Sequence, residues 1–236
     1  MLAPAARVRT PELMDQPGLD QDAHRHALDS LGRASLISRT TASLWPSIRS
    51  AVDTVGSSPV RILDLACGGG HLAVDLARQC ADAGIHAEVL GCDVSPVALD
   101  YAGKLAAQRG VRGIRFARLN VLADPLPGGF DIVCCSLFLH HLADDEAEDM
   151  LRKMKAAAAR LVAVSDLRRT NLGLLYTVVG CRLLSRSRVF HIDGARSVRA
   201  AFTTDEMRTL ADRAGLLGAR VANCWPQRLV LVYEIG

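Results

Sequence analysis

Aromatic residues are scarce in this chain of 236 residues, where phenylalanine, tryptophan and tyrosine together make up 4% of the sequence. Proteins that bind single-stranded nucleic acid stack the bases on aromatic side chains, so the scarcity argues against that class. The net charge of +3 is also too small to argue for nucleic-acid binding by itself. Nucleic acid is therefore not a favoured partner.

Paired cysteine spacings are also absent. The seven cysteines are scattered along the chain and no C-x-x-C pair occurs. This pattern indicates neither a zinc site nor a disulfide framework. Most of the cysteines lie in apolar segments, where a reduced cysteine behaves as a small buried hydrophobic residue. We therefore expect a protein of the reducing cytoplasm.

Long apolar runs are missing as well. The longest, residues 172–184, includes Tyr176, Thr177 and Arg182 and is too short to span a bilayer. The N-terminal residues lack the basic and apolar regions of a secretory signal. Half of the residues are nevertheless hydrophobic, enough for one α/β domain with a full core. We expect a folded protein without a transmembrane segment.

A glycine cluster stands where an apolar segment gives way to a helical pattern. Residues 60–65 predict a strand, and Gly68, Gly69 and Gly70 follow it. Glycine has no Cβ, so the backbone at 68 and 70 can turn tightly and approach a ligand. Amide groups at the start of the next helix would face that ligand. The spacing is not the dinucleotide pattern G-x-G-x-x-G but D-x-[GA]-x-G-x-G, starting at Asp64.

Polar residues follow the next predicted strands. Residues 87–92 predict a strand that ends before Asp93, which stands about 20 residues past the glycine turn, where Rossmann-like folds place a ribose-binding carboxylate. Further strands are predicted at 114–119, 130–136 and 160–166, with helical patterns between most of them. This alternation implies a parallel sheet with helices on both faces.

These segments resemble, in order and spacing, the motifs of the class I S-adenosylmethionine (SAM) methyltransferases. Residues 64–70 resemble motif I, with Ala66 at its first small position, and residues 130–142 resemble motif IV. The resemblance implies an α/β fold with a Rossmann-like, seven-stranded, mostly parallel sheet whose last strand is antiparallel. It places a SAM-binding domain at 56–236, after an N-terminal helical arm at 1–55. A helical cap insertion is expected after the fifth strand, at about 168–202.

The resemblance also assigns a cofactor site, with SAM as the methyl donor and S-adenosylhomocysteine (SAH) as the product. The glycine turn would hold the methionine portion, Asp93 the ribose and Asn120 the adenine. The reactive methyl group would lie beside the end of the fourth strand. The cofactor-binding residues expected on this basis are Asp64, Ala66, Cys67, Gly68, Gly70, Asp93, Val94, Asn120, Val121, Ser136 and Leu137.

Two adjacent histidines follow the fourth strand. A general base helps methyl transfer only when the acceptor is a weak acid such as a phenol, and His140 and His141 are the candidate catalytic bases. We place His140 in the pocket and give His141 a structural role; the alternative that one of them caps or packs a helix stays open. Related ubiquinone-type O-methyltransferases carry metal-binding acidic residues here, where this chain has Leu137 and His140. We therefore expect no metal site.

The insertion after the fifth strand is expected to select the acceptor. Its apolar segment, 172–184, would cover the pocket and suit a lipophilic small molecule. Arg168, His191 and Arg199 are the polar groups that could converge on it, with surface solvation as the alternative. This segment resembles bacterial methyltransferases of polyketide and phenolic-lipid secondary metabolism. It favours O-methylation of a hydroxylated aromatic, polyketide or quinone-like acceptor.

Two other functions stay open at this level. An RNA-modifying methyltransferase could use the arginines between positions 182 and 199 as a phosphate-binding face. A non-catalytic SAM-binding protein is less favoured, because the cofactor motifs are intact. The chain is expected to be a monomer or a homodimer. Locally, Pro46 is expected to start or break a helix, and residues 191–194 to form a turn.

Overall fold

The computed structural model describes residues 6–16, 18–53 and 59–236. Residues 1–5, 17, 54 and 55 of the predicted N-terminal arm and residues 56–58 of the predicted SAM-binding domain lie outside the described residues. The helices are α1 (Gln21–Ser38), α2 (Thr40–Val52), α3 (His71–Asp82), α4 (Pro96–Gln108), η1 (Leu139–His141, a 3-10 helix), α5 (Asp144–Ala157), α6 (Asn171–Leu184), α7 (Arg188–Ala200) and α8 (Thr204–Arg213). The strands are β1 (Val60–Leu65), β2 (Ala87–Asp93), β3 (Ile114–Arg118), β4 (Phe130–Ser136), β5 (Ala158–Leu167), β6 (Arg220–Cys224) and β7 (Arg228–Glu234).

All of these strands belong to one sheet, in the order β3-β2-β1-β4-β5-β7-β6. Neighbouring strands are parallel except where β7 takes part, because β7 runs antiparallel to both β5 and β6. The predicted Rossmann-like, mostly parallel sheet with an antiparallel last strand is confirmed. The predicted bounds agree with β1 and β4 and differ by one or two residues at the ends of the other strands.

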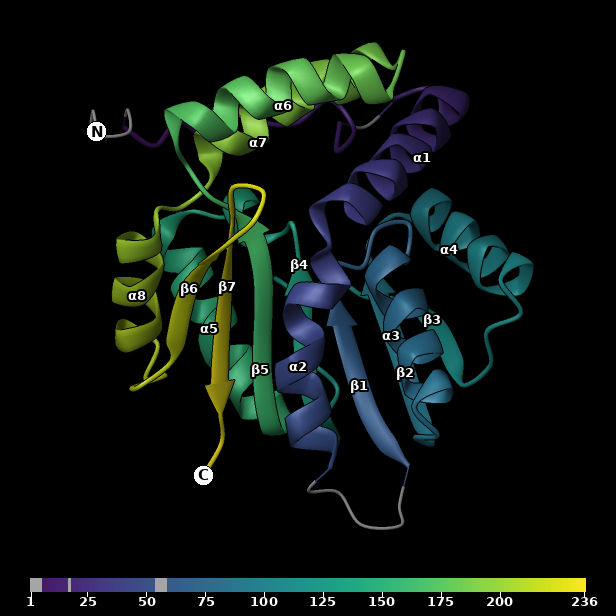
Figure 1. The fold of residues 1–236 in the computed structure, drawn as a ribbon, viewed down its shortest axis with the longest axis vertical. Helices are drawn as coiled ribbons and strands as arrows, with labels where there is room; N and C mark the ends of the chain where they lie inside the picture. The colour runs from purple at the N-terminus through teal and green to yellow at the C-terminus, as the bar shows by residue number, and fades with distance from the viewer. Residues whose placement is uncertain (1–5, 17, 54–58) are drawn as a thin grey trace.

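Helices cover both faces of the sheet, with α2, α3 and α4 on one face and α5 and α8 on the other (Figure 1). Successive side chains of a strand point to opposite faces. Ile62 of β1 accordingly packs with α2 and α3, whereas Leu63 and Leu65 pack with α5 and α8. Because both faces are covered, the central strands β1, β4 and β5 carry apolar residues on both faces rather than on alternate positions only.

The N-terminal region is divided between the core and a cap. In α2, Leu44, Ile48 and Val52 are buried in the same cluster as Ile62, so this helix belongs to the core of the sheet. Helices α1, α6 and α7 instead lie over the edge where the parallel strands end (Figure 1). A capping side chain starts each of these cap helices. Asp20 accepts from backbone amides at the start of α1, Thr170 does so for α6, and Ser187 does so for α7.

Two local predictions were wrong. Pro46 lies inside α2, and the break comes earlier, at Arg39, whose φ is 50°. Residues 191–194 do not form a turn but belong to α7. A Cβ added to Gly194 would lie 2.7 Å from Cys181 Sγ of α6. The glycine therefore permits close packing of two helices, which its local sequence does not distinguish from a turn.

Candidate functional site

The turn after β1 forms an open cradle. Ala66, Gly68 and Gly70 have positive φ angles of 51°, 52° and 74°. A Cβ added to Gly68 would have no atom within 4 Å, whereas one added to Gly70 would lie 2.7 Å from Ala102 Cβ. Gly68 therefore leaves its backbone accessible to a ligand, and Gly70 allows the turn to pack on α4.

Asp93, at the end of β2, holds this turn in place. Its Oδ2 accepts from the backbone N–H of Gly68 at 2.8 Å, and its Oδ1 accepts from the backbone N–H of Ser95 at 2.8 Å. Each carboxylate oxygen has a second lone pair, so both can accept a further hydroxyl. The same side chain thus orders the turn and presents acceptors beside it.

Asp64 lies beneath the turn and is 1% exposed. Its Oδ2 has no hydrogen-bond partner among the described residues. Burial, and secondarily the charge of Asp93, raise the pKa of Asp64 to about 8. At neutral pH this carboxyl group is therefore mostly protonated. Its O–H group can then donate a hydrogen bond beneath the glycine turn.

A cavity of about 900 Å³ opens above the turn. Of the predicted cofactor residues, it is lined by Ala66, Cys67, Gly68, Asp93, Val94, Ser136 and Leu137. Four of the predicted residues lie outside its lining: Asp64, Gly70, Asn120 and Val121. Asn120 Oδ1 accepts from the backbone N–H of Leu122, and Val121 packs in the core. Leu122 lines the cavity instead. The predicted roles of Asn120 and Val121 in cofactor binding stay predictions.

A second cavity of about 460 Å³ lies beneath α6 and α7 and is mainly apolar. Both cavities are lined by Met14, Leu31, Ser35, Leu137 and His141. These shared residues lie at the end of β4 and on the arm and helix that face it. The two cavities therefore meet at the end of β4, where the sequence predicts the reactive methyl group of the cofactor.

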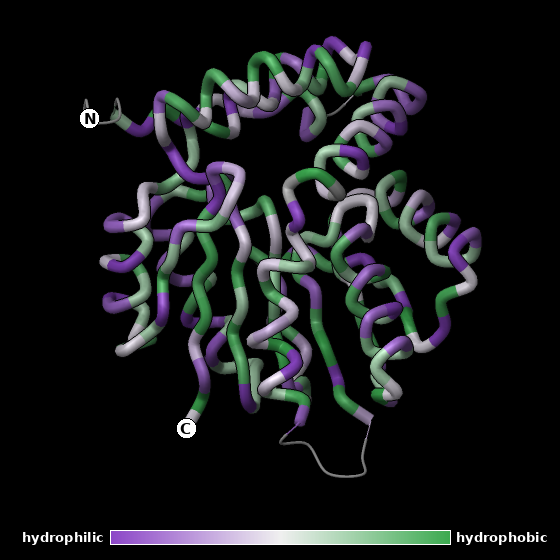
Figure 2. Tube along the Cα trace, viewed as in Figure 1, coloured by the Kyte–Doolittle hydropathy of each residue, from purple (hydrophilic) through white to green (hydrophobic). Residues whose placement is uncertain are grey.

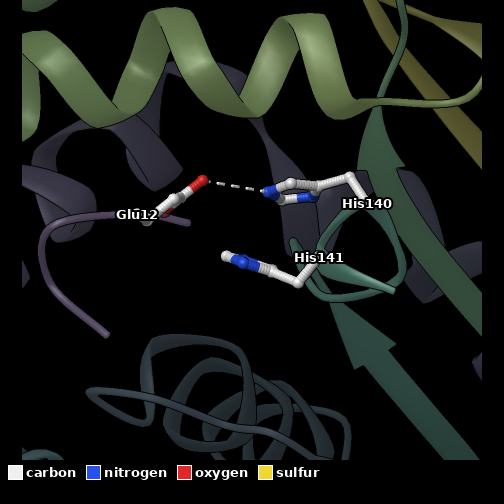
Figure 3. Close-up of side chains that lie close together, drawn as sticks. All are labelled: Glu12, His140 and His141. Atoms are coloured by element: carbon white, nitrogen blue, oxygen red, sulfur yellow. Dashed lines mark ion pairs between the residues drawn. The ribbon is translucent and has the colours of Figure 1, made fainter. Parts of the chain in front are cut away.

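His140 is buried, lines the second cavity and lies between two carboxylates, those of Asp166 and Glu12. Figure 3 shows its pairing with Glu12 and the neighbouring His141. His140 Nδ1 lies 2.7 Å from Asp166 Oδ1, and its Nε2 lies 3.5 Å from Glu12 Oε1. Burial lowers the pKa of His140, but the charge and hydrogen bond of Asp166, followed by those of Glu12, outweigh it and raise the pKa to about 10. His140 is therefore a buried imidazolium at neutral pH, with both ring nitrogens engaged.

His141 lies at the junction of the two cavities. Its Nδ1 is 3.3 Å from Asp15 Oδ2, and its ring centroid is 4.2 Å from that of His140. It lines both cavities, whereas His140 lines the apolar one alone. His140 was predicted to lie in the pocket, and it does line the apolar cavity, beside Asp166 and Glu12. The catalytic role of either histidine stays a prediction.

Glu12, His140 and His141 also form a donor set of the kind that can hold a divalent metal. One ligand atom from each lies within 4.8 Å of the other two. In the described structure Glu12 and His140 pair with each other as opposite charges. The absence of a metal site therefore stays a prediction. Glu12 was missed because it stands far from the motifs in a segment without periodicity.

The N-terminal segment 6–16 forms one wall of both cavities and is held by polar contacts. Arg7 donates to the carbonyl oxygens of His140, Leu142 and Ala200. Asp193 of α7 accepts from the backbone N–H groups of Leu13 and Met14, at 2.8 and 3.0 Å. The segment thereby fixes Glu12, Met14 and Asp15 over the site.

The predicted substrate residues lie elsewhere. Arg168 donates to Gln227, His191 Nε2 lies 2.7 Å from the carbonyl oxygen of Ser185, and Arg199 is exposed. None of these three lines the apolar cavity. The polar residues that α7 turns toward it are Asp193 and Ser197. Their separation by four residues, one helical turn, is the signal that could have found them, had 191–194 been assigned to a helix.

Comparisons with known proteins agree with this geometry. Residues 62–160 match a family described as a methyltransferase domain. The chain is 38% identical over 119 residues to the demethylmenaquinone methyltransferase of Thermus thermophilus, covering 49% of this chain and 52% of that protein. It is 32% identical over 170 residues to the ubiquinone biosynthesis O-methyltransferase of Bordetella parapertussis, covering 70% of this chain and 65% of that protein.

These matches span between 52% and 65% of the length of the two curated relatives. Among solved structures, the fold is similar to magnesium protoporphyrin IX methyltransferase from Synechocystis with bound SAH. The TM-score is 0.58 at 18% identity, over 94% of this chain and 91% of that one. At that identity the likeness concerns the fold alone.

Proposed function

We propose that this chain is a class I SAM-dependent methyltransferase with SAM as its cofactor, and that it methylates the oxygen of a small, lipophilic, hydroxylated acceptor. The observation that carries the proposal is the junction of two unlike cavities at Leu137 and His141. The cavity above the glycine turn suits the cofactor. The apolar cavity under α6 and α7 suits the acceptor.

The larger cavity has the groups that the cofactor requires. When bound, SAM supplies a methyl group already activated by its sulfonium. The open backbone at Gly68 lets the chain approach the methionine portion, and Asp64 keeps a donor beneath it. Asp93 has free lone pairs for the ribose hydroxyls. These residues bind and orient, which is the main contribution a protein makes to such a displacement.

The smaller cavity supports an apolar acceptor with one hydroxylated end. Its wall under α6 and α7 is largely apolar, and its polar residues include His140, His141, Asp193 and Ser197. Enclosure by the cap excludes water from the reacting groups. The names of the two curated relatives, which refer to quinone biosynthesis, support a phenolic or quinol-like acceptor. Polyketide phenols belong to the same chemical class.

We assign the base to His141. Asp15, near its Nδ1, favours the tautomer that leaves Nε2 free to accept a proton from the acceptor hydroxyl. His140 does not take this role, because Asp166 and Glu12 keep it protonated. It acts as a positioning residue, which fixes η1 and thereby His141 next to the end of β4.

The test combines methyl-labelled SAM with a series of phenols that differ in acidity and in alkyl chain length. Wild-type protein is expected to place label on the phenolic oxygen, which mass spectrometry and NMR of the product distinguish from carbon methylation. His141→Ala is expected to lower kcat by about 100-fold with ordinary phenols. The loss of kcat in this variant should be much smaller with electron-poor phenols, which ionise without a base. His86→Ala, at an exposed histidine before β2, is the matched control.

Three results would contradict the proposal. An equal loss of kcat in His141→Ala for all phenols would contradict the assignment of His141 as the base. Label that enters RNA from a cell extract, rather than an organic-soluble product, would remove the acceptor class. Loss of turnover in EDTA, restored by a divalent metal, would show that the cluster of Glu12, His140 and His141 holds a metal in the reaction.

A further inference from the structure

Helix α6 carries an apolar stripe on its outer side. Its members, each between 46% and 81% exposed, are Leu172, Leu175, Tyr176, Val179 and Leu183. They recur at intervals of three and four residues, so they lie along one face of the helix. Gly173 and Cys181 are instead buried. Figures 1 and 2 show α6 as an outer layer of the molecule, with apolar residues along most of its length. A contiguous exposed stripe of this kind marks an interaction surface.

The stripe is continuous with the mouth of the apolar cavity. Tyr176 of the stripe lines that cavity and is also exposed, as are Ile37 of α1 and Trp225 of the β6–β7 loop. This loop touches the start of α6, where Thr170 Oγ1 donates to Gln227 Oε1 at 2.7 Å. Whatever covers the stripe therefore also covers the entrance to the cavity.

The charged side chains of α6 and of the loop that follows it are all basic. Residues 171–188 contain Arg182, Arg186 and Arg188 and no aspartate or glutamate. All three arginines are exposed. Arginines beside an apolar stripe bind the anionic headgroups of a membrane, and an exposed tryptophan suits the interface between headgroups and acyl chains.

We propose that α6 docks this protein on the surface of an anionic lipid bilayer, with the mouth of the apolar cavity turned toward the lipid. A lipophilic acceptor then passes from the bilayer into the cavity without crossing water. This use of the surface rests on the proposed function. Among the described residues no helix is long and apolar enough to cross a membrane. The contact is therefore peripheral, with α6 lying in the plane of the interface.

A second copy of the chain fits this face less well. A two-fold symmetric contact places the same surface on both sides. It would bring two arginine-rich segments together, and neither supplies an acidic residue to pair with the other. It would also close the mouth of the cavity on both protomers. The charge and the position of the mouth thus favour a lipid surface as the partner.

Vesicle flotation tests the proposal. Wild-type protein is expected to float with phosphatidylcholine–phosphatidylglycerol vesicles and much less with phosphatidylcholine alone. Leu175→Asp combined with Leu183→Asp should weaken the partition by about tenfold or more. Arg186→Glu combined with Arg188→Glu should remove the preference for anionic vesicles. The matched control is Leu217→Asp, at a leucine that is 72% exposed in the loop before β6.

Two outcomes overturn the docking: wild-type protein that stays with the aqueous phase, or a Leu217→Asp loss equal to that of the α6 variants. A wild-type dimer in light scattering that the α6 variants convert to a monomer would assign the surface to self-association instead. SAH affinity and turnover of a water-soluble phenol are measured on the same preparations. Turnover without vesicle binding removes the docking alone, and vesicle binding without turnover removes the proposed function alone.

Discussion

A single carboxylate, that of Asp93, joins the glycine turn to the start of α4 through the backbone N–H groups of Gly68 and Ser95. Asp93→Ala removes these acceptors together with those offered to the ribose. Hydrogen bonds to a charged group contribute about 1.5–3 kcal/mol, so the affinity for SAH should fall by about 10- to 100-fold. Calorimetry measures the change. Asp100→Ala, at an exposed carboxylate paired with Lys104, should leave the affinity unchanged. Unchanged SAH affinity in Asp93→Ala would contradict the assignment of Asp93 to the ribose of the cofactor.

His140 should make the stability of the protein depend on pH. Its pKa of about 10 in the folded state lies above the value of about 6.5 expected in the unfolded chain. The folded state therefore holds an extra proton between these values. The stability that this provides is complete below about pH 6.5 and is lost as the pH rises toward 10. Urea unfolding at a series of pH values measures the decline.

The variant His140→Gln tests the cause of that decline. Removing one partner of a buried ion pair leaves Asp166 without its counter-charge, which costs about 3–5 kcal/mol at neutral pH. The gap between wild type and variant should narrow toward pH 10, where wild-type His140 loses its proton. His86→Gln, at an exposed histidine, should follow the wild-type curve. A gap that stays constant with pH would show that His140 is neutral in the folded protein.

At the scale of elements, the side chain of Asp193 in α7 binds the backbone of the arm 6–16. Asp193→Ala leaves the backbone N–H groups of Leu13 and Met14 without their acceptor. The arm should then detach more often, and trypsin should cleave after Arg9 about tenfold faster, because proteolysis follows the population of open states. The KM for the acceptor should also rise, since the arm walls both cavities. Asp205→Ala, at an exposed carboxylate of α8, is the control. Equal cleavage rates would show that the other contacts of the arm hold it without Asp193.

The elements also show how far a sequence predicts this structure. The strands and the glycine turn were predictable, because apolar period and glycine spacing are local signals. The helix α7 was not, because Gly194 serves packing against α6 and its local sequence reads as a turn. Glu12 gave no signal at all. Its position over His140 follows from tertiary contacts between segments that are more than a hundred residues apart in the chain.

On the scale of the whole molecule, the site belongs to no single layer. The sheet supplies the glycine turn, Asp93 and the end of β4, and the cap supplies the apolar cavity. Motifs revealed the first part because cofactor binding restricts the residue type at each position. The acceptor side is built from α1, α6, α7 and the arm, and its shape depends on how these pack together. The sequence therefore predicted the glycine turn and its surroundings more completely than the cavity under the cap.

Because ligand binding is linked to the unfolding of the whole chain, a bound cofactor should raise the melting temperature. At an SAH concentration 100 times Kd the stabilisation is about 2.7 kcal/mol, which corresponds to roughly 5–10 °C for a chain of this size. Gly68→Val should abolish this shift, because its side chain would point into the open cradle. The strain of valine at positive φ lowers the melting temperature by itself, so a control is needed. Gly110 has a similar φ of 62° with nothing within 4 Å of an added Cβ. Gly110→Val should therefore suffer the same strain but retain the SAH shift. If Gly68→Val also retains it, the cofactor does not lie against the glycine turn.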